Sequence, residues 1–293
     1  MTQTSDRELT IDADNPLGLD GIEFVEYSTA KPQALGQVLE LMGFRPVARH
    51  RSREVLLYRQ GEMNIIVNAH AAGMDRSVLP SETPVIAAIA LRVRDAAAAY
   101  RHAIARGAWV VPSRVEVMEL NIPAIHGVGA SRIYFVDRYR EFSIYDVDFT
   151  TIPTVDSTPP ALTGLHWFGI VQYISNDRME DWTEFYSALF GFKALPDTER
   201  FGILPKGRIL RSPCHTFYLQ LIEPEPGIFD AERNESLQRI GLGTPDVLAT
   251  VDALRKRGVT FIESPAVRSE AHGALTKSFM GGVMFELVHD ERA

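Results

Sequence analysis

Histidine and cysteine are side chains that bind transition metals and take part in nucleophilic catalysis. The chain carries eight histidines and one cysteine, Cys214, which stands directly before His215. A thiol and an imidazole can form a nucleophile and its base. Direct sequence neighbours rarely reach that geometry, however, and no third group that would orient the imidazole is evident. A single cysteine also excludes an internal disulfide and a cysteine-rich metal cluster.

The charge and composition exclude several classes of partner. The formal net charge is −8, whereas a protein that binds nucleic acid usually presents a basic face. The N-terminal stretch MTQTSDRELTIDADNP is polar and acidic, and no apolar run is long enough to span a bilayer. The pair Gly281-Gly282 precedes a strand rather than a helix, so no phosphate-binding loop is implied. We therefore expect a cytoplasmic protein with a small-molecule ligand and neither a nucleic-acid nor a membrane partner.

The elements that must position the polar side chains recur along the sequence. The segments GIEFVEYSTAKPQALGQVLELMGF and FGIVQYISNDRMEDWTEFYSALFGF each predict a short apolar strand, a polar turn and an amphipathic helix. Each helix ends in a Gly-Phe pair, Gly43-Phe44 and Gly191-Phe192, and glycine just past a helix is the usual left-handed cap.

A second pair of segments repeats the same theme. AIALRVRDAAAAYRHAIARGAWVV and QRIGLGTPDVLATVDALRKRGVTFI each contain a strand, an Asp at the helix start (Asp95, Asp246) and an Arg-Gly stop (Gly107, Gly258). Aspartate at a helix start accepts hydrogen bonds from free backbone N–H groups. The sequence therefore predicts four similar quarters, each with a strand, a helix and further strands. This pattern is typical of an α+β protein.

The quarters pair into two halves joined by a Thr- and Pro-rich stretch, TTIPTVDSTPPALTG. We predict an N-terminal domain over 15–152, a linker over 153–162 and a C-terminal domain over 163–293. Each half should be a mixed sheet curled around a cavity, with its helices outside.

Several motifs resemble one known family. NPLGLDGIEFVEY, MELNIPAIHGVG and SIYDVDF in the first half, and RMEDWTEFYSALFGF, LQRIGLGTPDVLATVDALRKRGVTF and FMGGVMFE in the second, are similar to bacterial 4-hydroxyphenylpyruvate dioxygenase. The resemblance implies the vicinal-oxygen-chelate (glyoxalase) fold of four βαβββ modules in two domains, the first non-catalytic. It also implies aromatic metabolism: oxidative decarboxylation of an aryl-pyruvate by O₂ and Fe(II), the iron being held by two His and one carboxylate.

The positions of that iron triad depart from the family pattern. A gap-free count back from Arg178-Met179 places Gly169 where the family has its first His, and Arg239 follows Gln238 where the second His stands. Glu286, in Met-Phe-Glu, keeps the carboxylate. Glycine has no side chain and arginine has no lone pair to offer, so only Glu286 can bind a metal well. The sequence therefore predicts a degenerate metal site and no cofactor, with Fe(II) or another divalent metal as the alternative.

Recruited histidines would restore a metal site. His166 lies three residues before Gly169, and because strand side chains alternate, it should face the opposite side unless a bulge or an alignment shift intervenes. His289 fails by the same parity relative to Glu286, and His215 could overhang the cavity from the start of a strand. With such ligands the chain would be a true Fe(II) 4-hydroxyphenylpyruvate dioxygenase.

The altered site has its own physical logic. The fold offers inward positions at Gly169, Gln220, Arg239 and Glu286, with Gln238 beside them. An isolated buried carboxylate is costly, and Arg239 can supply the missing positive charge. We expect Arg239 and Glu286 to face each other, Arg239 binding a ligand carboxylate, Glu286 acting as general acid or base, and Gly169 leaving room for the ligand.

The predicted function follows from this set. The chain is expected to be a divergent homologue that acts on or binds a small oxo or carboxylate compound, aromatic ones included, in the C-terminal cavity, and to form homo-oligomers as the resemblance implies. In a non-enzymatic alternative, the ion pair is a structural plug and the protein only binds or sequesters a small molecule.

Overall fold

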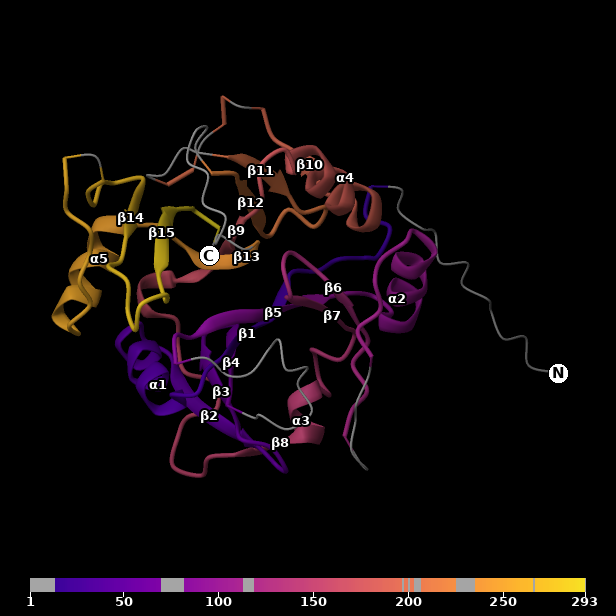
Figure 1. Ribbon diagram of the computed structural model, residues 1–293. Coiled ribbons are helices and arrows are strands. Elements are labelled where there is room, and N and C mark those ends of the chain that lie inside the picture. Colours follow the sequence, from indigo (N-terminus) through magenta and orange to yellow (C-terminus); the bar gives the residue numbers. More distant parts are fainter. Residues whose placement is uncertain are drawn as a thin grey trace.

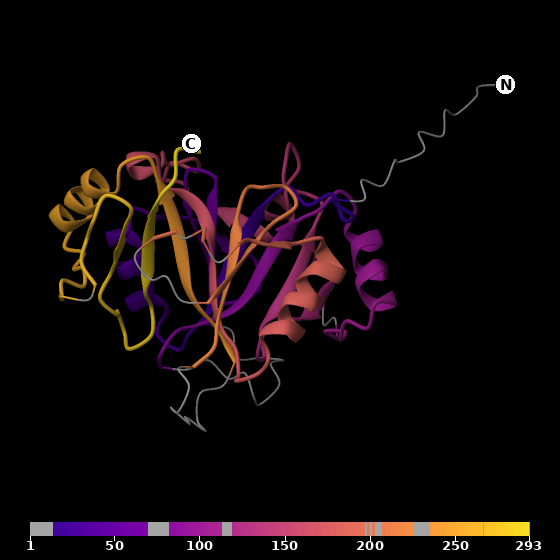
Figure 2. The same ribbon diagram turned by 90° about the horizontal axis from the view of Figure 1, so that it is seen from above.

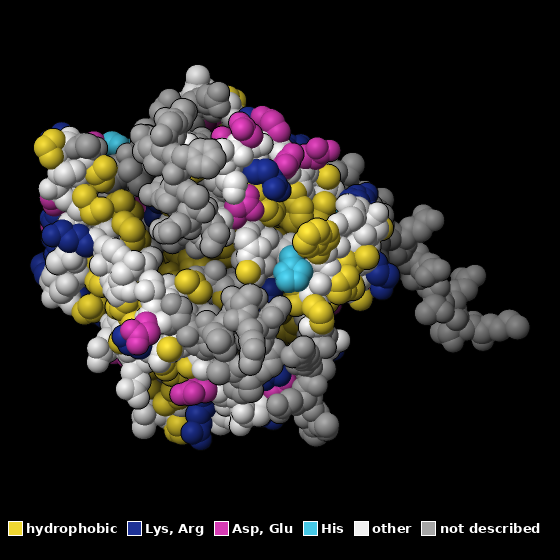
Figure 3. Space-filling model, in the orientation of Figure 1, with side chains coloured by type: hydrophobic (Ala, Val, Ile, Leu, Met, Phe, Trp, Pro, Cys, Tyr) yellow, Lys and Arg dark blue, Asp and Glu magenta, His cyan; other side chains and the backbone are white. Residues whose placement is uncertain are grey.

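The computed structural model describes residues 14–69, 82–112, 119–196, 198–199, 201–202, 207–224, 235–265 and 267–292. Within these ranges the chain forms one large curled, unclosed sheet, with the longer helices at its periphery (Figures 1 and 2). The expected α+β fold is confirmed. On the face shown in Figure 3, basic and acidic side chains are interspersed among the coloured residues. No helix in the described part of the chain has the length and apolar character needed to cross a membrane.

The first half of the chain supplies eight strands and three helices of the described residues. In chain order they are β1 (Ile22–Ser28), α1 (Pro32–Leu41), β2 (Arg45–His50), β3 (Val55–Gln60), β4 (Met63–Asn68), β5 (Val85–Arg92), α2 (Ala96–Ala105), β6 (Ala124–His126), β7 (Arg132–Val136), α3 (Ile144–Asp148) and β8 (Phe149–Thr151).

The second half repeats this plan after a short 3-10 turn. In chain order its elements are η2 (Leu162–Gly164), β9 (His166–Tyr173), α4 (Met179–Phe190), β10 (Lys193–Ala194), β11 (Arg208–Arg211), β12 (Tyr218–Ile222), β13 (Ser236–Thr244), α5 (Val247–Lys256), β14 (Gly273–Leu275) and β15 (Phe285–His289).

The predicted helix boundaries are confirmed where the sequence signals were strong. Asp95 caps α2 by accepting from the Ala98 backbone N–H at 2.8 Å, and Asp246 caps α5 by accepting from Ala249 at 2.9 Å. Gly191 ends α4 with φ of +79°, the left-handed conformation that glycine adopts without steric cost. These local signals therefore fix where each helix starts and stops.

Strand pairing is the same in the two halves and joins them into one sheet. In the first half β1 pairs parallel with β4 and antiparallel with β5, and β5 pairs parallel with β7. In the second half β9, β12, β13 and β15 take the corresponding places. The halves meet where Ile86 on β5 pairs with Leu237 on β13. The larger of two buried hydrophobic clusters spans both halves, with Phe135 of β7 stacked on Phe190 of α4 at 6.1 Å.

The stretch predicted as the linker is held against the first half by hydrogen bonds. The Gly61 N–H donates to the Pro159 carbonyl at 2.8 Å, and Arg59 donates to the Ser157 carbonyl at 2.9 Å. Gln60, which is fully buried, accepts from the Leu162 N–H at 2.8 Å. The connection is thus part of the packed structure, and it sets where β9 begins.

A β-bulge in β9 decides which side chains face the C-terminal cavity. Gly169 pairs with Gly241 and Trp167 pairs with Leu242, so Phe168 is an extra residue on β9. A bulge of this kind shifts the alternation of side chains by one, so that residues before and after it exchange faces. In the first half an equivalent bulge lies at the same place in β1, between Ile22 and Phe24. The bulge is therefore a property of the repeat.

The bulge places His166 on the concave side of the sheet, contrary to strict alternation. His166 pairs with Gly243, and a Cβ built on Gly243 would meet its imidazole Nε2 at 2.3 Å. Gly243 shares its face with Val288, which lines the cavity. The alternative with a bulge is therefore the one observed, and the extra residue reverses the parity counted from Gly169.

The bulge also explains why position 169 is glycine. A Cβ on Gly169 would lie 2.2 Å from the backbone carbonyl oxygen of Tyr218, its partner on β12. The missing side chain therefore points at a neighbouring backbone, not into open space. Gly169 also lines the C-terminal cavity, and that it leaves room for a ligand stays a prediction.

We predict that Gly169→Ala lowers the free energy of unfolding by about 1–3 kcal/mol, because β12 must shift to admit the methyl group. Gly241→Ala is the matched control, since a Cβ there would meet nothing closer than 3.4 Å. Urea unfolding followed by circular dichroism measures both. Equal stability of the two variants would contradict the close approach.

Candidate functional site

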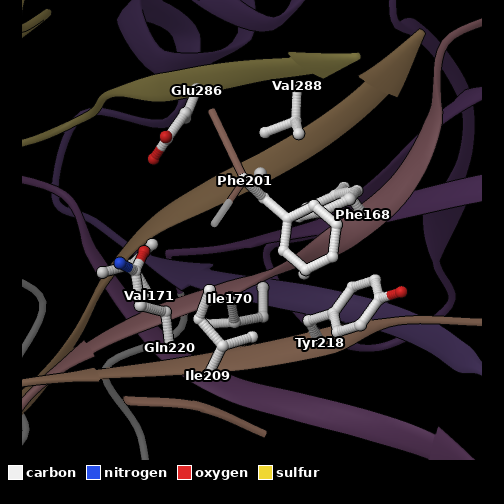
Figure 4. A pocket seen from close by; sticks show the side chains of 11 residues that line it. Phe168, Ile170, Val171, Phe201, Ile209, Tyr218, Gln220, Glu286 and Val288 are labelled. Carbon is white, nitrogen blue, oxygen red and sulfur yellow. The ribbon is translucent and has the colours of Figure 1, made fainter. Parts of the chain in front are cut away.

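A small cavity lies on the concave side of the C-terminal half. Its volume is about 30 Å³, and its lining comes from β9, β11, β12, β13, β15 and Phe201. Figure 4 shows that Glu286 and Gln220 lie at one end, whereas the rings of Phe168, Phe201 and Tyr218 gather at the other. The cavity therefore has a polar end and an aromatic end.

The polar end contains a buried ion pair. Arg239 Nε donates to Glu286 Oε2 at 3.0 Å, and the two side chains are 3% and 5% exposed. The pairing of Gly241 with Glu286 puts Arg239, two residues earlier on β13, on the same face as the carboxylate. The expected proximity of these two residues is thus observed. Arg239 does not line the cavity directly but reaches it through Glu286.

The guanidinium of Arg239 has unused hydrogen-bonding capacity. Its Nη2 atom is buried and has no hydrogen-bond partner among the described residues. A buried donor without an acceptor costs about 1–3 kcal/mol, and Arg side chains favour bidentate contacts with carboxylates. One donor of the guanidinium is thus left without an acceptor among the described residues.

Burial dominates the protonation of Glu286. It raises the pKa of the Glu286 carboxyl above its ordinary value, although the charge and hydrogen bond of Arg239 act in the opposite direction. The carboxyl is therefore easier to protonate than an exposed glutamate. A protonated Glu286 could donate a hydrogen bond, and an ionised one could accept a proton.

The aromatic end consists of three rings in mutual contact. The ring centroid of Phe201 lies 4.8 Å from that of Tyr218 and 5.3 Å from that of Phe168, and the Phe168 and Tyr218 centroids are 5.0 Å apart. The next residue, Gly202, has φ of +65°, and a Cβ there would lie 2.4 Å from Glu286 Oε1. The chain at 201–202 thus passes directly over the carboxylate.

The outer side of the aromatic end is covered by residues near the end of the chain. The Arg292 guanidinium lies 5.2 Å from the Tyr218 ring centroid and donates to Asp290 at 2.9 Å. His166 contacts Asp290 at 3.3 Å through Nε2 and the Gly164 carbonyl at 2.9 Å through Nδ1. Burial alone would raise the pKa of Asp290, but hydrogen bonds from Arg292 and His166 lower it. His166 thus stabilises this covering segment.

The other predicted site residues are placed as follows. Gln220 lines the cavity from β12, across the parallel pair from Val171. Gln238 is the extra residue of a second bulge, in β13, and does not line this cavity. Sequence reasoning missed Phe168 and Phe201. Tyr218 could have been found, because it alternates with Gln220 along β12.

The first half has a different polar arrangement at the corresponding place. Glu23 lies at the bulge of β1. One of its carboxylate oxygens accepts from Arg92 Nε at 2.6 Å, and the other accepts from the Asn64 side-chain amide at 3.3 Å. Asp146 lies in α3, where it accepts from the Ser143 N–H at 2.8 Å. The first half thus places a carboxylate–guanidinium pair on different strands from the second.

The donor atoms around Glu286 do not fit the Fe(II) site that the resemblance implies. Glu286 is one carboxylate already bonded to a guanidinium, position 169 cannot carry a side chain without moving β12, and His166 bonds Asp290 and a carbonyl. In the described part of the chain, no group of three or more His, Cys, Asp or Glu is arranged to hold a metal ion. The described residues around Glu286 therefore do not match a set of two histidines and one carboxylate.

Comparison with protein families covers most of the chain. Residues 13–150 match the family model described as hydroxyphenylpyruvate dioxygenase, N-terminal, and residues 164–276 match the glyoxalase/bleomycin resistance protein/dioxygenase superfamily. Together with the paired, curled half-sheets, these matches define a protein of the vicinal-oxygen-chelate fold.

Individual relatives narrow this class. Hemolysin VllY of Vibrio vulnificus is 35% identical over 87% of this chain and 75% of its own length. The 4-hydroxyphenylpyruvate dioxygenase of Pseudomonas aeruginosa is 33% identical over 87% of this chain and 74% of its own length. A solved xylose isomerase-like TIM barrel/4-hydroxyphenylpyruvate dioxygenase fusion protein is similar with a TM-score of 0.74 and 26% identity, over 94% of this chain and 50% of that one. The chain belongs to the 4-hydroxyphenylpyruvate dioxygenase family.

We predict that Arg239→Met destabilises the protein by about 3–5 kcal/mol near pH 8, because it leaves a buried carboxylate without its partner. Since the folded-state pKa of Glu286 is raised, the folded state binds more protons than the unfolded state, and stability falls as pH rises through that interval. The loss should thus be smaller near pH 5.

Urea unfolding at both pH values tests this prediction. The double variant Arg239→Met/Glu286→Leu is expected to recover most of the stability. A pH-independent loss would contradict a buried ionised carboxylate.

We also predict that anaerobic loading with Fe(II) leaves well below one iron per chain, because two family ligand positions hold no donor. Elemental analysis after desalting measures the ratio, and a 4-hydroxyphenylpyruvate dioxygenase relative treated in parallel is the positive control. Iron near one per chain that disappears in Glu286→Gln would mean that other ligands are recruited around this carboxylate.

Proposed function

We propose that the C-terminal cavity binds a small oxo acid or carboxylate at Arg239 and Glu286, without iron at the family positions. The chain would then be a divergent, metal-independent member of its family. The observation that carries this proposal is the buried Arg239–Glu286 pair with a guanidinium nitrogen that has no partner among the described residues. That nitrogen is the natural receptor for a ligand carboxylate.

Charge balance makes the proposal specific. A bound carboxylate adds a negative charge beside Glu286, and two carboxylates sharing one site raise the pKa of one of them further. Because burial already raises the pKa of Glu286, ligand binding would be accompanied by uptake of a proton on this residue. The loaded site would then hold one guanidinium, one neutral carboxyl and one ligand anion.

The same arrangement has a chemical capacity. With its carboxylate held by Arg239, an oxo acid would present its neighbouring carbonyl oxygen near the protonated Glu286. Glu286 could donate a hydrogen bond or its proton to that oxygen, the role of a general acid. Gln220, which lines the same end of the cavity, supplies an amide that can orient the ligand.

Isothermal titration with glyoxylate, the smallest oxo acid, tests the proposal. The double variant Arg239→Gln/Glu286→Gln removes both charges and keeps side chains of similar size. We expect wild type and the control Arg268→Gln, an exposed arginine, to bind alike, and the double variant to bind at least about tenfold more weakly. Affinity should fall as pH rises, with proton uptake detected in buffers of different ionisation enthalpy. Unchanged binding by the double variant would refute the proposal.

Two other functions remain distinct candidates. The family dioxygenase activity, with recruited ligands, predicts oxygen uptake on 4-hydroxyphenylpyruvate after iron loading. A non-enzymatic binding module predicts ligand binding without turnover, which NMR of the bound oxo acid would reveal.

A further inference from the structure

The aromatic end of the cavity is already filled by the protein itself. Phe168 and Tyr218 are carried by the paired strands β9 and β12, whereas Phe201 comes from outside the sheet. Figure 4 shows the Phe201 ring at the aromatic end, beside the other two rings and on the side toward Glu286. Its centroid distances of 4.8 and 5.3 Å are those of packed aromatic pairs.

The remaining space is too small for the aromatic ring of a ligand. The cavity measures about 30 Å³, which suits one or two waters or a few heavy atoms. A cavity that accepts benzene is several times larger, about 150 Å³. An aryl ligand could therefore enter only if one of the three rings left its place.

The outer boundary closes the same end. Arg292 lies over both Tyr218 and Phe168, with centroid distances of 5.2 and 6.0 Å. Asp290 and the His215 carbonyl accept from this guanidinium and hold it there. A ligand ring could not extend outward past Phe168 and Tyr218 without displacing this cation.

From these contacts we infer that Phe201 takes the position of a ligand's aromatic ring, so that the site selects small non-aromatic oxo acids or carboxylates. The inference rests on the proposed function and specifies its ligand class. Phe201 is the specificity-determining residue: it fills the aromatic end, and Gly202 beside it brings the backbone against Glu286. What remains accessible is the polar end, next to Glu286 and Gln220.

The test compares two ligands that differ only by a phenyl group, glyoxylate and phenylglyoxylate, in wild type and Phe201→Ala. We expect wild type to prefer glyoxylate by at least about tenfold. Phe201→Ala should bind phenylglyoxylate at least about tenfold more tightly than wild type does, because burying a ring in the vacated space is favourable. Titration calorimetry gives all the affinities.

Two further variants make the result interpretable. Phe142→Ala removes an exposed phenylalanine, 57% accessible, and should change neither affinity. Phe201→Leu vacates less space and should give a smaller gain than Phe201→Ala, which also guards against a folding defect. Phe201 is partly exposed and lies outside the buried core, so both variants should fold.

The outcomes separate this inference from the function on which it rests. If wild type binds phenylglyoxylate as tightly as glyoxylate, or if Phe201→Ala gains no affinity for it, the role of Phe201 is refuted while carboxylate binding survives. If neither ligand binds to wild type or to any variant, the proposed function fails and the inference fails with it.

Discussion

The buried ion pair between Arg239 and Glu286 is the interaction on which the C-terminal cavity depends. The carboxylate alone would be an uncompensated charge in a packed interior, and the guanidinium next to it supplies the opposite charge. The parallel pairing of β13 with β15 holds both groups on one face of the sheet. The pair is internally neutral, and it leaves one guanidinium nitrogen without a partner among the described residues.

The backbone around this pair has adapted together with the side chains. The bulge at Phe168 turns position 169 toward the Tyr218 carbonyl, where only glycine fits, and directs the Phe168 ring into the cavity. Phe201 adds a third ring, and Gly202 lets the chain approach Glu286. Strand pairing thus brings the Tyr218 backbone against position 169, and aromatic packing fills one end of the cavity.

Much of the fold could be predicted because its signals are local. The fourfold repeat, the aspartate caps of α2 and α5 and the glycine stop of α4 follow from hydrogen bonding and backbone sterics within a few residues. The facing of Arg239 and Glu286 could also be anticipated, since an Arg and a Glu at inward positions of neighbouring strands have few other ways to be buried. The side of the sheet on which His166 lies could not be predicted, because one extra residue in a strand reverses the alternation and leaves no mark in the sequence.

By itself, then, the sequence determined the α+β repeat plan and the family, because both depend on residue type and spacing. It also predicted an incomplete set of metal-binding side chains at three positions. Only the tertiary structure decided how large the cavity is, that Phe201 fills its aromatic end and that His166 supports the covering segment at Asp290 rather than the site. These properties arise from contacts between residues far apart in the chain, whose distances depend on how the strands pair and pack.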